Sequence, residues 1–230
     1  MDRSGRDVEF ASNGEPARGY LARPARRSGP GVLVIQEWWG LVDHIRDVCD
    51  RFARAGFVAL APDLYRGETA SDPDTAARLM LDLEISRAAR DLDGAVNALL
   101  SQNETAGGTV GAVGFCMGGQ LALFAGTRNR RIGAVVDCYG IHPNVKLDLA
   151  NLEAPVLGIF AERDTFVPPA AVKALEAELG KAGKRADFTI FPGVDHAFLN
   201  DTRPDVYDAA AAERAWDRML SFLRAELAAS

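Results

Sequence analysis

The sequence predicts an α/β protein built on a mostly parallel central sheet with helices on both faces. Short apolar runs alternate along the chain with longer amphipathic segments, and Gly, Pro, Asn or Asp stand at the joints between them. Strands that alternate with helices usually form parallel pairs joined by right-handed crossovers. The 230 residues are most economically one domain, residues 1–230, and they suffice to bury a substantial core.

The strands are expected where apolar or alternating runs are bounded by turn residues. In chain order they are 8–11, 18–22, 32–35, 57–61, 109–115, 132–138, 155–160 and 187–191. Asn13-Gly14 is a plausible turn between the first two strands. The run Val32–Ile35 is apolar throughout, which is typical of a strand covered on both faces.

The helices are expected at 43–55, 91–100, 116–127, 169–179 and 208–228. Asp43 is predicted to cap the first helix, and Gly56 to close it. Residues 65–87 are polar, interrupted by Pro73 and only weakly helical, so we expect an excursion over one end of the sheet. Sites in such sheets form at the carboxyl ends of the strands, so the chemistry is expected there.

Charge and composition exclude several classes of partner. The chain has 26 Lys and Arg against 32 Asp and Glu, without a basic stripe, so nucleic acid is not an expected partner. The opening MDRSGRDVEF lacks the apolar segment of a signal peptide, and no later run reaches membrane-spanning length. Cys49, Cys116 and Cys138 form no CxxC pair, which fits reduced thiols and a cytoplasmic location.

The corner at Cys116 is the strongest chemical signal. In TVGAVGFCMGGQLALFAG, residues 109–126, an expected strand breaks at GFCMG and resumes as a helix. Gly-x-nucleophile-x-Gly between a strand and a helix is a nucleophile elbow, whose glycines allow the tight bend that presents the central side chain. The helix N-terminus beneath the sulfur favours negative charge, so this thiol is expected to ionise more readily than an ordinary one.

The alternative for Cys116 is a small buried side chain, which is the usual state of a free cysteine. The elbow context favours the nucleophile. Cys49 lies inside an expected helix and Cys138 at a strand end, so both are expected in the core.

A nucleophile of this kind needs a base and an acid that orients the base, in the chain order nucleophile, acid, histidine. His44 precedes the elbow and is expected on the surface of the first long helix. His142 follows the strand that ends at Cys138, where only Asp137 precedes it as a strand-end acid. His196, in the loop that leaves the last strand, is the better base.

Asp164, which follows the strand at 155–160, is the natural orienting acid, with Glu162 as the second candidate. A single strand-end Asp is more often a turn or cap residue. Cys116, Asp164 and His196 nevertheless fall at three separate strand ends in the expected order, which favours a catalytic set.

Acyl transfer also requires backbone donors for the developing oxyanion. One is expected to be the N–H of Met117, and the other that of Trp38, in the loop after the strand at 32–35. Trp38, Trp39, Tyr139 and Phe198 are candidate walls of an apolar acyl pocket, although aromatic residues near strand ends are as often core.

These features resemble the dienelactone hydrolase, or carboxymethylenebutenolidase, family within the α/β-hydrolase fold. The likeness is carried by VLVIQEWWG, GFCMGGQLA, CYG, AERDTFVP and GVDHAFLND, which lie between Val32 and Asp201. The resemblance implies an α/β-hydrolase fold and cleavage of lactone or ester bonds through a thioester.

The resemblance also implies roles for individual residues. Cys116 would be the nucleophile, His196 the base and Asp164 its orienter. Glu37 would meet the thiol in the resting site and take part in its activation when substrate binds. Without the family, Glu37 would be interpreted as a solvated strand-end acid.

One position departs from the family's pattern. The family member that acts on dienelactone helps hold the substrate carboxylate with an arginine a few residues after the histidine. The matching position here is Asn200, with Arg203 slightly further on. Arg78, in the excursion, is a candidate for a second such arginine, and both arginines could equally be exposed charges. The difference leaves the hydrolase chemistry in place and puts dienelactone itself in question.

Two other functions fit the same residues. One is a thioesterase or small-peptide hydrolase on this fold, and the other is a non-catalytic ligand receptor, a class that tends to lose part of the catalytic set. No cofactor or metal is expected, because the histidines are scattered and no phosphate-binding glycine loop occurs. The expected partner is a small-molecule lactone or ester, and no membrane association is expected. The sequence does not determine the oligomeric state, and a monomer is one of the possibilities.

Overall fold

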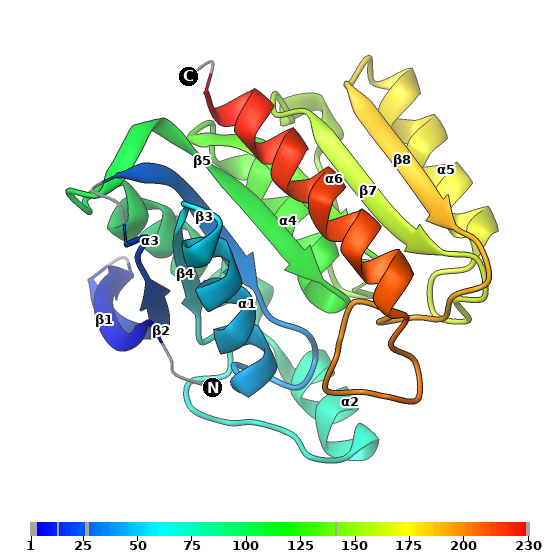
Figure 1. Ribbon diagram of the computed structural model, residues 1–230, viewed down its shortest axis with the longest axis horizontal. Helices are drawn as coiled ribbons and strands as arrows, with labels where there is room; N and C mark the ends of the chain where they lie inside the picture. The colour runs from blue at the N-terminus through cyan, green and yellow to red at the C-terminus, as the bar shows by residue number, and fades with distance from the viewer. Residues whose placement is uncertain (1–3, 13, 26–27, 141, 229–230) are drawn as a thin grey trace.

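Strands and helices alternate along the chain as the sequence predicts (Figure 1). The computed structural model describes residues 4–12, 14–25, 28–140 and 142–228. The strands are β1 (Arg6–Ser12), β2 (Glu15–Ala22), β3 (Gly29–Ile35), β4 (Val58–Pro62), β5 (Thr105–Phe115), β6 (Ile132–Cys138), β7 (Val156–Ala161) and β8 (Ala186–Phe191).

These strands form an eight-stranded sheet in the order β1-β2-β4-β3-β5-β6-β7-β8. The β1–β2 and β2–β4 pairs are antiparallel, and the pairs from β4 through β8 are parallel. The mostly parallel sheet is therefore confirmed, with an antiparallel hairpin at one edge. Asn13, predicted in the hairpin turn, lies outside the described residues.

The helices cover both faces of the sheet. They are α1 (Asp43–Arg54), α2 (Pro73–Asp82), α3 (Ile85–Leu100), α4 (Met117–Arg128), α5 (Pro169–Lys181) and α6 (Ala209–Leu227), with a 3₁₀ turn at Leu149–Asn151. Figure 1 shows α1 and α6 on the near face and α3 and α4 behind the sheet, with α2 lying beyond the strand ends. The α/β-hydrolase architecture expected from the resemblance is thus present.

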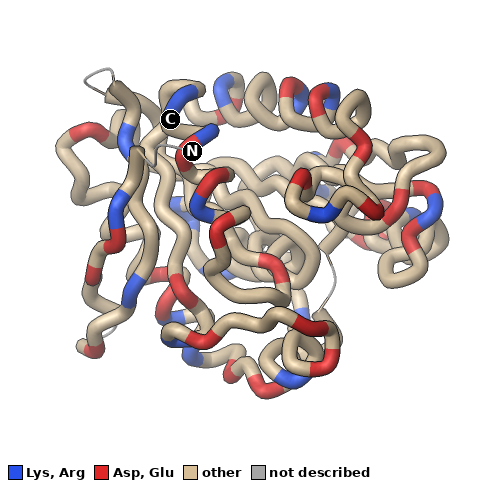
Figure 2. The backbone as a smooth tube through the Cα atoms, turned by 60° about the horizontal axis from the view of Figure 1, so that its bottom comes forward, with Lys and Arg blue, Asp and Glu red and all other residues tan. Residues whose placement is uncertain are grey.

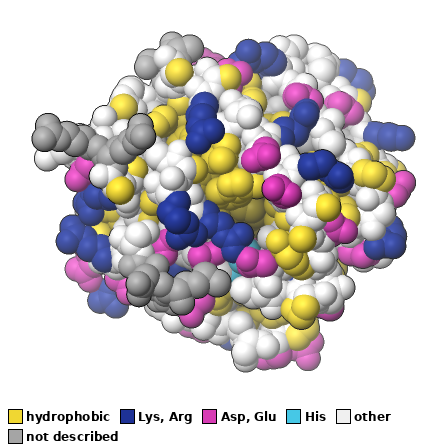
Figure 3. Space-filling view, viewed as in Figure 1, with side chains coloured by type: hydrophobic (Ala, Val, Ile, Leu, Met, Phe, Trp, Pro, Cys, Tyr) yellow, Lys and Arg dark blue, Asp and Glu magenta, His cyan; other side chains and the backbone are white. Residues whose placement is uncertain are grey.

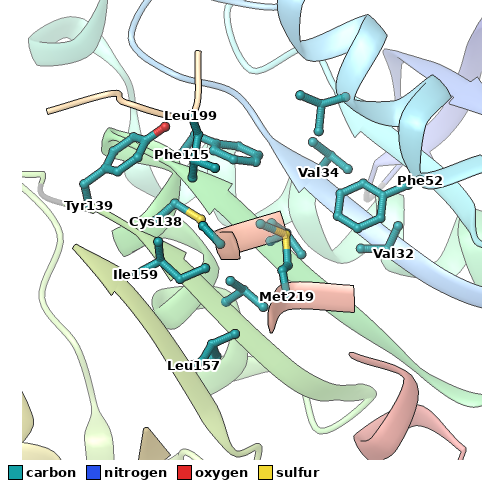
Figure 4. Packing of buried hydrophobic residues seen from close by; sticks show 14 of the residues in the cluster. Val32, Val34, Phe52, Phe115, Cys138, Tyr139, Leu157, Ile159, Leu199 and Met219 are labelled. Atoms are coloured by element: carbon teal, nitrogen blue, oxygen red, sulfur yellow. The ribbon is translucent and has the colours of Figure 1, made fainter. Parts of the chain in front are cut away.

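The core consists of an apolar cluster on each face of the sheet. Val32 and Val34 of β3 pack with Phe52 of α1 and Met219 of α6 (Figure 4). Leu33 and Ile35 of β3 belong to the cluster beneath α3 and α4. Because successive strand side chains point to opposite faces, an all-apolar run such as this one is buried on both sides.

Several boundaries differ from the prediction. Val42, not Asp43, is the N-cap of α1, and Asp43 is the first helical residue, where its carboxylate faces the positive end of the helix. α3 begins at Ile85 rather than at 91. Gly56 has φ 98°, the left-handed conformation that closes a helix.

Charged residues are spread along the chain. Figure 2 shows Lys and Arg interspersed with Asp and Glu along the backbone rather than gathered in a block of one sign. None of the helices described has the length and apolar character needed to cross a bilayer.

Candidate functional site

The corner at Cys116 has the backbone geometry of an elbow. Cys116 is the N-cap of α4, with φ 54° and ψ −126°. An added Cβ at Gly114 would lie 1.8 Å from the Gly118 carbonyl oxygen, and one at Gly118 would lie 2.5 Å from the carbonyl oxygens of Gln36 and Ile35. Glycine is therefore required on both sides of the thiol, as the sequence pattern predicts.

Asp164 and His196 meet at the same strand ends. The Nδ1 atom of His196 lies 2.7 Å from Oδ2 of Asp164. The other oxygen of Asp164 accepts the backbone N–H groups of Phe166 and Val167, at 2.8 Å each, which holds the carboxylate in place. Glu162, the second candidate acid, accepts the N–H of Gly193 instead.

The imidazole of His196 joins the carboxylate to the thiol. Burial alone would lower the pKa of His196, but hydrogen bonds to Asp164 and Cys116, together with their negative charges, raise it to about 10. An imidazole in this setting favours its charged form. His196 thus contacts the Asp164 carboxylate at 2.7 Å, and it shares the cavity with the Cys116 thiol that helps to raise its pKa.

Backbone strain is concentrated around these side chains. Among the described residues, the non-glycine positions with positive φ are Arg66, Cys116, Tyr139 and Ala197. Cys116, Tyr139 and Ala197 follow the ends of β5, β6 and β8 respectively. Such conformations cost roughly 1–3 kcal/mol each and cluster at functional sites.

Glu37 follows β3 and enters the same region from the other side. Its side chain is buried, and Oε2 accepts a hydrogen bond from the Nδ2 of Asn200 at 2.8 Å. Its Oε1 has no hydrogen-bond partner among the described residues. Glu37 and Cys116 line one cavity.

That cavity has a volume of about 330 Å³ and is mostly apolar. It is lined by Glu37, Trp38, Trp39, Pro73, Met80, Cys116, Phe166, His196, Ala197 and Arg203. Small-molecule sites are concave and apolar with a few convergent polar groups, and this cavity has that composition.

Comparison with known proteins identifies the family. The model of the dienelactone hydrolase family matches residues 17–227. The chain belongs to the dienelactone hydrolase family. It is 40% identical to "Protein usf" of Aquifex pyrophilus, over 96% of this chain and 98% of that protein. It is 37% identical to "Putative carboxymethylenebutenolidase" of Aquifex aeolicus, over 97% and 99% of the two chains.

A solved structure agrees. "Crystal Structure of Putative Dienelactone Hydrolase" from Klebsiella pneumoniae superimposes with a TM-score of 0.85 at 30% identity, covering 95% of this chain and 98% of that one. The resemblance seen in the sequence is confirmed. The protein is a hydrolase of the carboxylic ester class.

In this member of the dienelactone hydrolase family, only some of the residues predicted to form the substrate pocket line the cavity at Cys116. Trp39 and Arg203 line the cavity. Tyr139 and Phe198 are fully buried beside it, with the Tyr139 ring 5.0 Å from that of His196. Arg78 pairs with Glu68 and Asp82 and is not among the lining residues.

The two residues expected to supply oxyanion donors, Met117 and Trp38, lie in segments next to the elbow in the sheet. Met117 opens α4, and the N–H groups of a first helical turn have no acceptor within their own helix. Trp38 follows Glu37 after the neighbouring strand β3 and lines the cavity. Both residues therefore come from segments adjacent to Cys116.

The sequence did not indicate four of the lining residues: Pro73, Met80, Phe166 and Ala197. Pro73 and Met80 belong to α2, whose weak helical pattern carries no sign of which face meets the site. Phe166 is 58% exposed, with its ring 5.1 Å from that of His196. The adjacency of Phe166 to Asp164 in AERDTFVP is the signal that could have found it.

The two other histidines take no part in this arrangement. His44 is buried, not on the surface as predicted, because the loop after His196 covers the start of α1 and brings Asp201 within 3.5 Å of its Nδ1. His142 is also buried, and its Nδ1 accepts the N–H of Asn144. Across the ranges described, no group of three or more His, Cys, Asp or Glu side chains could hold a metal ion.

A second hollow lies on the α1 and α6 face. It has a volume of about 400 Å³ and includes Phe115, Leu199 and Trp216, with Arg51 and Glu213 among its lining residues. Figure 3 shows an apolar depression at the centre of this face with charged side chains around it. None of the residues predicted to react lines it, so the cavity at Cys116 is the candidate active site.

Proposed function

We propose that this enzyme hydrolyses lactone or ester bonds with Cys116 as nucleophile, His196 as base and Asp164 as its orienter. The observation that carries the proposal is the 2.7 Å bond between Asp164 and His196, whose imidazole lines the same apolar cavity as the Cys116 thiol. Side chains from three separate strand ends converge there, in the chain order that the elbow requires.

In the proposed reaction, the thiolate attacks the carbonyl carbon of the bound substrate. The N–H groups of Met117 and Trp38 hold the oxyanion. The carbon–oxygen bond then breaks, and the alcohol or enolate leaves with the proton of the His196 imidazolium, or unprotonated where the leaving group is stable. The product is a thioester on Cys116.

Deacylation uses the same imidazole. His196 is neutral at this stage, having given its proton to the leaving group or, where that group left unprotonated, to solvent. It takes a proton from water, and the resulting hydroxide attacks the thioester carbonyl. The carbon–sulfur bond breaks, the thiolate is regenerated and the carboxylic acid leaves. A thiol suits leaving groups that need little protonation, such as the enolate released from an unsaturated lactone.

The test combines turnover with mass measurement. Wild-type protein should hydrolyse a small activated aryl ester, and brief exposure to a slowly hydrolysed lactone should add one acyl group to the peptide containing Cys116. Cys116→Ala should remove both signals. Cys49→Ala, which deletes a buried thiol in α1, is the matched control and should retain both. Acylation elsewhere, or equal turnover by Cys116→Ala and wild type, would overturn the proposal.

A further inference from the structure

Asn200 holds the buried carboxylate of Glu37 in a fixed position. Asn200 and Glu37 are 2% and 1% exposed, and they are joined by the 2.8 Å bond from Nδ2 to Oε2. The other end of the amide, Oδ1, accepts the backbone N–H of Thr202 at 3.0 Å and its hydroxyl at 2.6 Å. A backbone N–H can only donate and a carboxylate can only accept, so both neighbours require this orientation of the amide.

The carboxylate of Glu37 has no cationic partner within the part of the chain that the structure describes. An amide donates a hydrogen bond without supplying charge, so the negative charge of Glu37 is held but not neutralised. The charge of Glu37 acts on neighbouring groups. The pKa values of Cys138 and Tyr139 are raised mainly by burial, and nearby negative groups that include Glu37 raise them further.

The one arginine that lines the cavity is already paired. The guanidinium of Arg203 lies 2.9 Å from the carboxylate of Asp205. His196, the other cationic group at the cavity, is offset by the negative charges of Asp164 and Cys116. The buried carboxylate of Glu37 is therefore the charge at the cavity that an entering acyl group would meet without a cation paired to it among the described residues.

The remaining walls are apolar and suit uncharged groups. Trp38 and Trp39 meet edge to face at 5.2 Å, and Phe166 packs against Trp38 at 6.2 Å. Met80 lines the cavity from α2. Such surfaces bind aromatic or aliphatic acyl groups through area removed from water.

We propose that Asn200 is the positioning residue for Glu37, and that this neutral amide makes the site select uncharged esters and lactones over substrates that carry a carboxylate. The inference rests on the proposed function, since it concerns the acyl group delivered to Cys116. A carboxylate on the acyl group would face Glu37 at short range in a partly dehydrated cavity, where like charges repel strongly.

Substrate selection is tested with two esters of nearly the same shape. One is the mono-para-nitrophenyl ester of terephthalic acid, and the other is that of terephthalamic acid, whose second carboxyl is a neutral amide. Each kcat/KM is divided by the rate constant for hydroxide hydrolysis of the same ester. The wild-type enzyme should prefer the neutral ester by about tenfold or more, which is the size expected for one unscreened like-charge contact. A ratio within twofold of unity would overturn the selection.

Changing the charge at position 200 should change that ratio. Asn200→Arg should lower the preference for the neutral ester at least about fivefold, and Asn200→Asp should raise it at high pH, where both facing carboxyls are ionised. Because each ratio is taken within one variant, a partial loss of folded protein cancels. If the arginine does not fold in this buried position, the wild-type and aspartate ratios decide the question.

Positioning of Glu37 is tested by a pH series. Asn200→Ala removes the donor and should lower kcat about tenfold with KM changed less than about threefold. Asn200→Asp should match the alanine variant at high pH and exceed it increasingly as the pH falls, because a proton shared between two facing carboxyls restores a donor to Glu37. An aspartate-to-alanine activity ratio that does not vary with pH would contradict the positioning role.

The two proposals fail in different ways. If Cys116→Ala retains turnover, the proposed function fails. If Cys116→Ala is inactive while wild type hydrolyses the charged and neutral esters equally, only the selection by Asn200 and Glu37 fails.

Discussion

Gly118→Ala should damage the elbow more than it damages the fold. The added Cβ would lie 2.5 Å from the carbonyl oxygens of Ile35 and Gln36, whereas real Cβ atoms essentially never approach within 3.0 Å. Both obstacles are backbone atoms at the end of β3, so no side-chain rotation can relieve the contact. The N-terminus of α4 must therefore move away from β3 by at least about 0.5 Å.

That movement separates the two proposed oxyanion donors, since Met117 lies on α4 and Trp38 follows β3. A misplacement of a reacting group by about 1 Å can lower the rate about 100-fold. A displacement of about 0.5 Å, with half the effect on the activation free energy, predicts a loss of about tenfold. Complete loss of one donor would cost about 100- to 1000-fold. We expect kcat/KM for an activated aryl ester to fall between these limits, with about 1–3 kcal/mol lost from the free energy of unfolding.

Gly126→Ala is the matched control on the same helix. Its Cβ would lie 2.7 Å from a methyl group of Val135 and 3.1 Å from one of Leu152, which are side-chain atoms remote from the thiol. Both substitutions gain the same helix propensity, about 1 kcal/mol. Steady-state kinetics and urea unfolding should show comparable stability losses but a rate loss only for Gly118→Ala. If Gly118→Ala keeps kcat/KM within threefold of the control, the elbow geometry does not limit catalysis.

Three further predictions use other parts of the site. Asp164→Asn keeps an oxygen that accepts the N–H groups of Phe166 and Val167, but it turns the amide NH₂ toward His196 and so favours the wrong tautomer of the imidazole. We expect kcat to fall about 1000- to 10,000-fold with little change in Tm. A loss below tenfold would contradict the orienting role of Asp164. Phe166→Ala should raise KM for aryl esters several-fold, because the ring lines the cavity. Leu81→Ala is the control, since Leu81 is similarly exposed, at 55%, but does not line the cavity, and its KM should stay unchanged. Equal KM values for the two variants would show that Phe166 does not contact the substrate. Burial raises the pKa of Asp137 to about 7, although the hydrogen bond from the Gly140 N–H lowers it. The Asp137 carboxyl therefore keeps its proton in the folded state at pH values above about 4, where the same carboxyl in the unfolded chain has lost it. Asp137 should therefore contribute a fall in stability of about 2 kcal/mol between pH 5.5 and 8. The raised pKa of His196 adds a fall in the same direction, so Asp137→Asn should remove only the part due to Asp137 in urea titrations, and parallel pH curves for the two proteins would refute the shift.

The sequence predicts the sheet and the elbow because both depend on local patterns. The apolar run at 32–35 and the glycines around Cys116 each specify a backbone conformation without reference to the rest of the chain. The convergence of Asp164 and His196 is nearly as accessible, since the carboxyl ends of parallel strands share one edge. Their hydrogen bond in the structure follows from this topology.

The contacts that depend on loop packing could not be predicted in the same way. His44 belongs to an amphipathic helix, and its burial results from a loop that arrives from the far end of the sequence. The pairing of Asn200 with Glu37 joins segments 163 residues apart, and no periodicity relates them. The cavity contacts that α2 contributes depend on how this weakly helical segment packs against the rest of the protein.

The register of the sheet explains why these distant contacts are nevertheless determined. Gly114 pairs with Ile35 on one side and with Asp137 on the other. In this register, the backbone of Gly118 fits against the carbonyl groups of Ile35, the last residue of β3, and of Gln36, the residue before Glu37. A slip of one residue would reverse every side chain of β5. The elbow glycines therefore do more than permit the bend: they fit the register in which the thiol and the carboxylate of Glu37 open into one cavity.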